Sequence, residues 1–369
     1  MLTIIVKGTN GCNLACSYCS LGKKDDFKFV NRETLEYIFD WSCSYAKQKN
    51  ENTINFILHG GEPTLIRTET YQAAINSIKM NYPELNVTIS MQSNGVAITD
   101  EFLQFIIRND MRMGISIDGT AEIHDLERRT FDGKESYQRV IKNIERMRQA
   151  GVDVSCLMVL TKNAVGKGYD YLNFFGQKHI HLKINPLLNY GEAYEHPELC
   201  LESGEYAEYL ISVYQYLIEK DIPATVSPID DIIRAIVNKQ RIGECSFNPD
   251  CSSHFLCIDY VGDIYPCGKF SDMNKFKLGN IKDNIVDESI LQTLNDRRGS
   301  KSPVACRKCE YLWLCNCGCS AEACIDGDFF AEPKLCKDYK MLFDYFSKDG
   351  LILLRKELIR QKRILEEKR

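Results

Sequence analysis

The residues with the clearest chemical potential lie in a loop near the N-terminus, which reads Gly11-Cys12-Asn13-Leu14-Ala15-Cys16-Ser17-Tyr18-Cys19. Three thiolates at C-x3-C-x2-C spacing can ligate three irons of a [4Fe-4S] cluster and leave the fourth iron open for a chelating substrate. A zinc site is the alternative, but zinc prefers four ligands and commonly uses C-x2-C pairs with a second pair elsewhere. Because no fourth cysteine lies near this triplet, the spacing favours a cluster with one open iron.

A second group of cysteines fills the C-terminal part of the chain. Of the 17 cysteines, 11 fall between Cys245 and Cys336. In a chain of this size without a secretion signal, such enrichment indicates metal binding or catalysis rather than disulfides. The segment from Cys306 to Cys319, taken alone, could also be a zinc ribbon.

Charge and hydropathy exclude other classes of protein. The net charge of −5 gives no reason to expect nucleic-acid binding, and no apolar stretch approaches the roughly 20 residues of a membrane span. The first residues, MLTIIVKGTNGC, lack the charged region and cleavage site of a signal peptide, which predicts a cytoplasmic protein. The chain starts directly at its first strand, so it has no room there for a further recognition domain of about 100 residues.

The pattern of apolar residues predicts the strands and helices that position the first cysteine loop. Short runs rich in Val and Ile alternate with amphipathic helical stretches, and six β-α units in a row predict a parallel sheet. This is either an open doubly wound sheet or a partial barrel, and ligands bind at the carboxyl ends of the strands in both. The predicted strands are Leu2–Val6, Ile54–Leu58, Val87–Met91, Met113–Ile117, Val154–Leu160 and His179–Ile184.

Four segments are expected along the chain. Residues 1–225 form the β-α domain and 226–244 a helical linker, in which Ile229, Ile232, Ile233 and Ile236 form one stripe. Residues 245–345 form the cysteine-rich domain, with many turns and little periodicity. Residues 346–369 form a C-terminal helix with a basic face, for which a solvated face is favoured over peptide docking.

Several polar motifs follow the predicted strands. His59-Gly60-Gly61-Glu62-Pro63 follows the second, Ser93-Asn94-Gly95 ends the third, and Ser116-Ile117-Asp118-Gly119 ends the fourth. Glycines allow close backbone approach to a ligand, and Glu62 can accept a hydrogen bond from an ammonium group. Ordinary turn chemistry is the alternative for the Ser-Asn-Gly and Asp-Gly segments.

The cysteine triplet, with Tyr18 before its third cysteine and the Gly-Gly-Glu-Pro motif, resembles the radical S-adenosylmethionine (SAM) superfamily. The resemblance implies that Cys12, Cys16 and Cys19 hold a [4Fe-4S] cluster whose open iron binds SAM and cleaves it to a 5′-deoxyadenosyl radical. A further family pattern, H-D-x-x-R-x4-G, matches His124 to Gly133 and makes Arg128 the candidate for the SAM carboxylate, with Arg129 one residue away. The implied SAM contacts are Tyr18, Gly60, Gly61, Glu62, Ser93, Asn94, Ser116, Asp118 and Arg128.

The C-terminal cysteines resemble the SPASM domain, an extension of peptide-modifying radical SAM enzymes that holds two auxiliary [4Fe-4S] clusters. Its flanks match as well, in Gly262-Asp263-Ile264-Tyr265-Pro266-Cys267 and Leu278-Gly279-Asn280-Ile281. By position, auxiliary cluster I would be held by Cys245, Cys251, Cys267 and Cys319. Auxiliary cluster II would be held by Cys306, Cys309, Cys315 and Cys336, while the roles of Cys257, Cys317 and Cys324 stay open.

The resemblance is closest to the anaerobic sulfatase-maturating enzymes, but two positions depart from them. Those enzymes carry a catalytic Asp directly after the cysteine that matches Cys267, whereas this chain has Gly268, which cannot take a proton. His59 stands where they have Gln. No catalytic acid or base is therefore assigned.

The function predicted from these features is oxidative modification of a side chain in a ribosomally made peptide or a protein. Products would be an oxidised residue or a C–C, ether or thioether crosslink. Because all four cysteines of auxiliary cluster I are present, electron acceptance is favoured over binding of a substrate thiolate. Sulfatase maturation, oxidation of a small molecule such as a carbohydrate, and a non-catalytic scaffold are the alternatives. The implied partners are a peptide or protein substrate and an electron donor such as flavodoxin or ferredoxin. Either a separate protein binds the substrate leader, or the enzyme engages the substrate directly.

Overall fold

The computed structural model describes residues 1–22, 26–325, 327–348 and 350–367. All six predicted strands are present; the fifth has the predicted bounds, and the ends of the others shift by at most three residues. The sixth begins later than expected because His179 adopts a left-handed conformation that closes the preceding helix. The strands are β1 (Leu2–Lys7), β2 (Thr53–His59), β3 (Asn86–Ser93), β4 (Arg112–Ser116), β5 (Val154–Leu160) and β6 (Leu182–Pro186).

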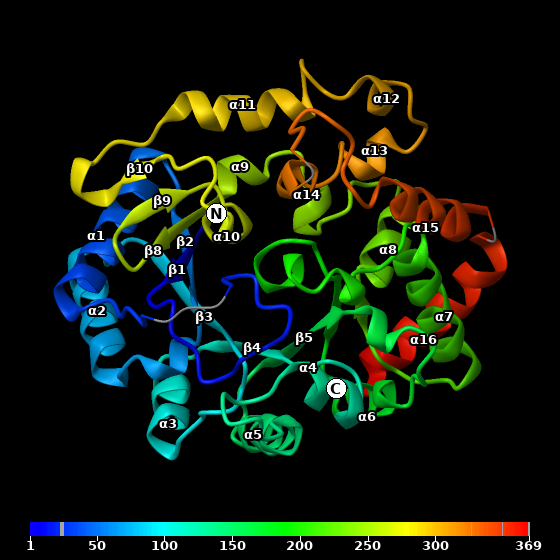
Figure 1. Cartoon of the computed structure of the whole chain (residues 1–369), viewed down its shortest axis with the longest axis horizontal. Coiled ribbons are helices and arrows are strands. Elements are labelled where there is room, and N and C mark those ends of the chain that lie inside the picture. The colour runs from blue at the N-terminus through cyan, green and yellow to red at the C-terminus, as the bar shows by residue number, and fades with distance from the viewer. Residues whose placement is uncertain (23–25, 326, 349, 368–369) are drawn as a thin grey trace.

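These six strands are parallel neighbours in chain order, which is the arrangement of a partial (β/α)6 barrel. Figure 1 shows the strands curving around a central space with helices on the outside. Side-chain caps begin several helices; the Thr99 side chain, for example, accepts a hydrogen bond from the Phe102 backbone N–H. The helices of this part are α1 (Arg32–Gln48), α2 (Thr68–Asn81), α3 (Asp100–Arg108), α4 (Ala121–Glu127), α5 (Tyr137–Gln149) and α6 (Tyr171–Lys178).

The C-terminal part extends the same sheet past β1. Strand β8 (Phe255–Asp259) pairs in parallel with β1, and the antiparallel strands β9 (Asp263–Tyr265) and β10 (Gly279–Asn280) follow it. At the other edge, β7 (Val226–Ser227) pairs with β6 in the segment predicted to be a helical linker. None of β7 to β10 was predicted. β7, β9 and β10 have only two or three residues each, too few for a periodic pattern, and the apolar run of β8 lies in a segment expected to be rich in turns.

Several cysteines of the C-terminal part, among them Cys251, Cys315 and Cys336, begin or end a helix, whereas Cys257 lies in β8. The long helix α16 lies within the segment predicted to be a C-terminal helix, 346–369, of which residues 349 and 368–369 lie outside the described residues. In the described part of the chain, no helix is long and apolar enough to cross a membrane. The helices are α7 (Glu205–Glu219), α8 (Ile229–Asn238), α9 (Cys251–His254), α10 (Gly268–Asp272), α11 (Glu288–Arg298), α12 (Val304–Arg307), α13 (Leu312–Cys315), α14 (Ser320–Ile325), α15 (Cys336–Lys348) and α16 (Gly350–Glu367).

A fully buried arginine organises the irregular loops between these short helices. Arg297 donates hydrogen bonds to the backbone carbonyls of Phe329, Cys317 and Ala331 at 2.7, 3.0 and 2.9 Å. A guanidinium can satisfy several carbonyls at once because it carries five N–H donors in a fixed plane. Arg297 thereby holds the backbone next to the last cysteines where regular secondary structure is absent.

Candidate active site

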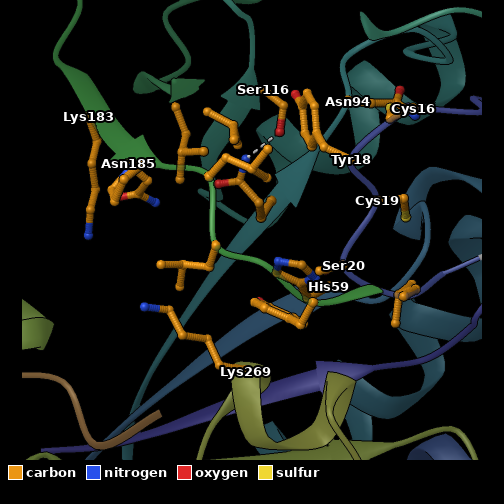
Figure 2. Close-up of a pocket in the computed structure, with 18 of the residues that line it drawn as sticks. Cys16, Tyr18, Cys19, Ser20, His59, Asn94, Ser116, Lys183, Asn185 and Lys269 are labelled. Carbon is orange, nitrogen blue, oxygen red and sulfur yellow. Dashed lines mark hydrogen bonds between the residues drawn. The ribbon is translucent and has the colours of Figure 1, made fainter. Parts of the chain in front are cut away.

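A cavity of about 290 Å³ opens at the carboxyl ends of the barrel strands. Its walls come from the N-terminal cysteine loop, from the ends of β2, β3, β4 and β6, and from the C-terminal part of the chain. Figure 2 shows Cys16, Cys19 and Asn94 on one side of this space, with Lys183 and Lys269 reaching toward it from β6 and α10. Segments far apart in sequence therefore share one site.

Cys12, Cys16 and Cys19 all line this cavity and are half-buried. Backbone hydrogen bonds hold their loop on the segment after α4, from Ala15 N–H to the Arg129 carbonyl at 2.7 Å and from Ser17 N–H to the Glu127 carbonyl at 3.1 Å. Burial raises the pKa of Cys12 to about 11 and that of Cys16 to about 12. These thiols thus need a metal or cluster to become thiolates at neutral pH.

The two glycines after β2 bring that loop against the cysteine loop. A Cβ atom on Gly61 would lie 2.0 Å from the Gly11 carbonyl oxygen, and one on Gly60, whose φ is +135°, would lie 2.4 Å from the Thr9 carbonyl oxygen. The Gly61 N–H donates to the Thr9 carbonyl at 2.7 Å. Glycine is required here because the two backbones leave no space for a side chain.

Seven of the nine residues predicted to contact SAM line the cavity; these are Tyr18, Gly60, Gly61, Ser93, Asn94, Ser116 and Arg128. The other two lie behind its wall. Glu62 accepts hydrogen bonds from the side chains of Thr64 and Ser93 and from the Thr64 and Asn94 N–H groups. Its carboxylate is buried and engaged by the protein, so it braces the β3 loop.

Asp118 is the second residue behind the wall, and it holds Arg128. Its carboxylate accepts from Arg128 Nε at 2.7 Å and from a terminal guanidinium nitrogen at 3.3 Å, and also from the Tyr18 hydroxyl. The Arg128 guanidinium lies 5.2 Å from the centre of the Tyr18 ring. Arg128 thus faces the cavity in a fixed orientation, whereas the adjacent Arg129 donates to the Asp125 carbonyl.

A second cavity, of about 310 Å³, is lined by Cys245, Cys251, Cys267 and Cys319. This is the complete set predicted for auxiliary cluster I, gathered from the segment before α9, from α9 itself, and from the residues directly before α10 and α14. The two cavities share Ser20, His59, Tyr190 and Lys269 in their walls. The two cysteine sets therefore face each other across one layer of side chains.

The set predicted for auxiliary cluster II also comes together. Cys306, Cys309, Cys315 and Cys336 line a third, smaller cavity, and Cys317 lies beside them. Cys317 is hydrogen-bonded to Cys306, which places it at this set and not beside Cys319. Within the described residues, no three His, Cys, Asp or Glu side chains form a site for a single metal ion; each cysteine set lines an open space instead.

Three buried or half-buried lysine–carboxylate pairs were not predicted. Lys7 bonds to Asp272, Lys183 to Glu244, and Lys269 to Glu322 at 3.1 Å, all in the walls of the first two cavities. The sequence held no signal for them, because each lysine and its partner are more than 50 residues apart. Burial alone lowers the pKa of Lys269, but the negative charges of Cys319 and Glu322 outweigh it and raise the pKa well above its ordinary value.

His59 stands between the two cavities. Its Nδ1 accepts the Gly60 N–H at 2.8 Å, which leaves the proton of the neutral ring on Nε2. Burial, with Lys7 nearby, lowers the pKa of His59 to about 4. His59 is therefore neutral at physiological pH and can offer Nε2–H as a donor.

The family model of the radical SAM superfamily matches residues 6–165. A cysteine-type anaerobic sulfatase-maturating enzyme from Clostridium perfringens is 26% identical over 362 residues, covering 93% of this chain and 96% of that protein. The solved structure of native anSMEcpe with bound AdoMet and Cp18Cys peptide matches with a TM-score of 0.80 at 24% identity, covering 98% of this chain and 99% of that one. Streptococcus suis SuiB bound to its precursor peptide SuiA matches with a TM-score of 0.65 at 15% identity, covering 91% and 75%.

The family model covers the cysteine loop and most of the partial barrel, so this is an enzyme with a radical SAM domain over residues 6–165. Over nearly its whole length the chain is related to the anaerobic sulfatase-maturating enzymes.

Proposed function

We propose that this enzyme oxidises a side chain of a peptide or protein, with SAM held by the cavity residues and three [4Fe-4S] clusters held by the three cysteine sets. When bound, these cofactors supply a 5′-deoxyadenosyl radical and sites that take up an electron. The observation that carries the proposal is the shared wall: Ser20, His59, Tyr190 and Lys269 line both the SAM-side cavity and the cavity of the Cys245 set. A substrate side chain in the first cavity lies next to an electron-accepting site.

Different residues line the two sides of this cavity. Gly60 and Gly61 bring the β2 loop close to Cys12, and Arg128, held by Asp118, presents a cation for the SAM carboxylate. Lys183 and Lys269, each paired with a glutamate, form the opposite, polar wall. A substrate residue therefore enters between a SAM side and an electron-accepting side.

A peptide substrate is supported by the relatives. The anSMEcpe structure contains the Cp18Cys peptide and the SuiB structure contains the precursor peptide SuiA. We extend this to the present chain as part of the proposal, together with a one-electron donor protein that reduces the first cluster and a separate protein that presents the substrate leader.

Sulfatase maturation is the second candidate, since relatives of this chain bear that name. The residue that argues against it is Gly268. The position directly after Cys267 lacks a carboxylate, and Lys269 next to it is held in an ion pair with Glu322.

One experiment separates the candidates. The anaerobically reconstituted enzyme is incubated with SAM, a reductant and either short peptides encoded beside its gene or a sulfatase peptide spanning the residue to be modified. Mass spectrometry should show loss of two hydrogens from a neighbouring-gene peptide, with one 5′-deoxyadenosine formed per product. Conversion of the sulfatase peptide alone would move maturation to first place. Analysis of iron checks the cofactors: three clusters require about 12 irons per chain.

A further inference from the structure

The ammonium group of Lys269, a half-buried side chain, lies against the sulfur of a predicted cluster ligand. It is the second residue of α10, which begins directly after Cys267. Its Nζ lies 3.8 Å from Cys319 Sγ and 3.1 Å from Glu322 Oε1. One ammonium group thus touches a ligand sulfur and a carboxylate that is 2% exposed.

The carboxylate partner is itself fixed. Glu322 lies on α14, less than one helical turn after Cys319, and its second oxygen accepts a hydrogen bond from the Tyr339 hydroxyl at 2.9 Å. The Lys269 side chain is 34% exposed, and it lines the two cavities of the site. Glu322 and Tyr339 therefore aim the ammonium group at Cys319.

A simple stabilising ion pair would not need this arrangement. Buried ion pairs contribute little net stability, because their desolvation cost offsets their attraction. A hydrogen bond to a ligand sulfur has a different consequence, since it delocalises negative charge from the cluster. Reduction adds one electron, so a nearby donor and cation stabilise the reduced form more than the oxidised form and raise the potential.

We propose that Lys269 is a positioning residue that raises the reduction potential of the cluster held by Cys245, Cys251, Cys267 and Cys319, by donating a hydrogen bond to the Cys319 sulfur. This inference rests on the cluster assignment of the proposed function. In that function the substrate radical, formed when one hydrogen atom leaves, loses one electron and one proton. A higher potential at the Cys319 side of the cavity makes uptake of that electron more favourable.

The test measures potentials and needs no substrate. The full chain carries Cys12→Ala, Cys16→Ala and Cys19→Ala, so that only the auxiliary clusters remain, and it is titrated redox-potentiometrically with EPR detection. In this background, Lys269→Met should shift the midpoint potential of one cluster downward and leave the other unchanged. Lys269→Arg, which keeps the charge and the donors, should retain most of the parent value.

Two further variants separate this role from a structural one. Glu322→Gln removes a negative charge and should shift the same midpoint upward, opposite to Lys269→Met, whereas structural damage would move both the same way. Lys183→Met is the matched control, because Lys183 lines the same cavity in an ion pair with Glu244. It makes the same change in charge and should shift that midpoint less than Lys269→Met.

An unchanged midpoint in Lys269→Met, with iron intact, overturns the proposal, as does an equal shift in Lys183→Met. If Lys269→Met fails to retain iron, Glu322→Gln decides, and the absence of an upward shift then overturns it. Metal analysis distinguishes failure of the cluster assignment from failure of the Lys269 proposal. If the assignment is wrong, the triple-cysteine variant binds about 4 irons, or zinc, instead of about 8 irons.

Discussion

The Ser20 hydroxyl donates a hydrogen bond of 2.9 Å to an Asp272 carboxylate oxygen. Ser20 directly follows Cys19, and Asp272 ends α10, the helix that begins after Cys267. Lys7, from β1, bonds to the same Asp272 and donates to the Gly268 carbonyl at 2.8 Å. This polar bridge links the cysteine loop of the barrel to the helix of the C-terminal cysteine set.

This polar bridge should stabilise the folded protein, besides fixing the distance between the cysteine loop and α10. Lys7 and Asp272 are both less than a tenth exposed, so Asp272→Ala leaves an unpaired buried cation. We expect a loss of about 3–5 kcal/mol in the free energy of unfolding, measured by denaturant titration. The double variant Lys7→Met/Asp272→Leu removes both charges and should recover most of the loss. If the single and double variants are equally destabilised, the ion pair is not the reason.

Arg128 and Arg129 can be separated by SAM affinity. Arg128 faces the cavity and is oriented by Asp118, so Arg128→Met should weaken equilibrium SAM binding about ten-fold or more, the size of one charge-assisted hydrogen bond. Asp118→Asn should weaken it in the same direction by loosening Arg128. Arg129→Met is the control, because Arg129 bonds to the backbone carbonyls of Asp125, in α4, and of Gly133, after it. A larger loss in Arg129→Met than in Arg128→Met would assign the contact to Arg129.

Gly268 and Gly61 should respond oppositely to an added side chain. A Cβ on Gly268 meets its nearest atoms, in Ile5 and Lys7, at an ordinary 3.7 Å, so Gly268→Ala and Gly268→Asp should both fold. Gly268→Ala should be neutral or stabilising by up to about 1 kcal/mol. Gly61→Ala would place its Cβ 2.0 Å from a backbone oxygen and should cost about 3 kcal/mol or more, or lose SAM binding. Thermal unfolding and SAM titration measure both effects.

Gly268→Asp also tests the departure from the sulfatase-maturating relatives. It restores a carboxylate directly after Cys267, beside Lys7. If that carboxylate is the missing element, this variant should convert the sulfatase peptide that the parent leaves unchanged. Gly268→Asn, of the same size without the charge, should not. Equal inactivity of both variants would place the specificity difference elsewhere in the cavity.

Burial of His124 should make the free energy of unfolding depend on pH. It is fully buried, and burial lowers its pKa from 6.5 to about 4. Because the unfolded chain binds the proton more readily, stability is full above about pH 6.5 and falls as the pH drops toward 4. Between pH 7.5 and 5.5 the loss from this one group is about 1.4 kcal/mol.

The measurement compares the parent with His124→Gln by anaerobic denaturant unfolding at both pH values. The variant is less stable at pH 7.5, since His124 bonds to Ser136 at 2.9 Å, but its stability should fall less on acidification. The same slope in both proteins would contradict a neutral His124. The pKa of His59 is also lowered, but His59 is present in both proteins, so its effect on the pH dependence cancels in the comparison.

Much of this protein was determined by local sequence. The strands from Leu2 to Pro186 follow from short runs rich in Val and Ile between turn residues, because such side chains suit the pleated, half-buried surface of a strand. The roles of the cysteine loop and of the glycines after β2 could also be predicted from the sequence. Their chemistry depends on spacing along the chain, and ligands bind where parallel strands end.

Tertiary structure alone decided which polar groups face the cavity. Glu62 and Asp118, predicted as SAM contacts, turn behind the wall because backbone and side-chain donors from β3, Tyr18 and Arg128 surround them. The pairing of β8 with β1 brings Cys267 and Lys269 to the barrel mouth. Local periodicity in the sequence does not indicate which distant segments pair. The carboxylate partners of Lys7, Lys183 and Lys269 are likewise distant in sequence, and they meet these lysines only when the sheet has formed.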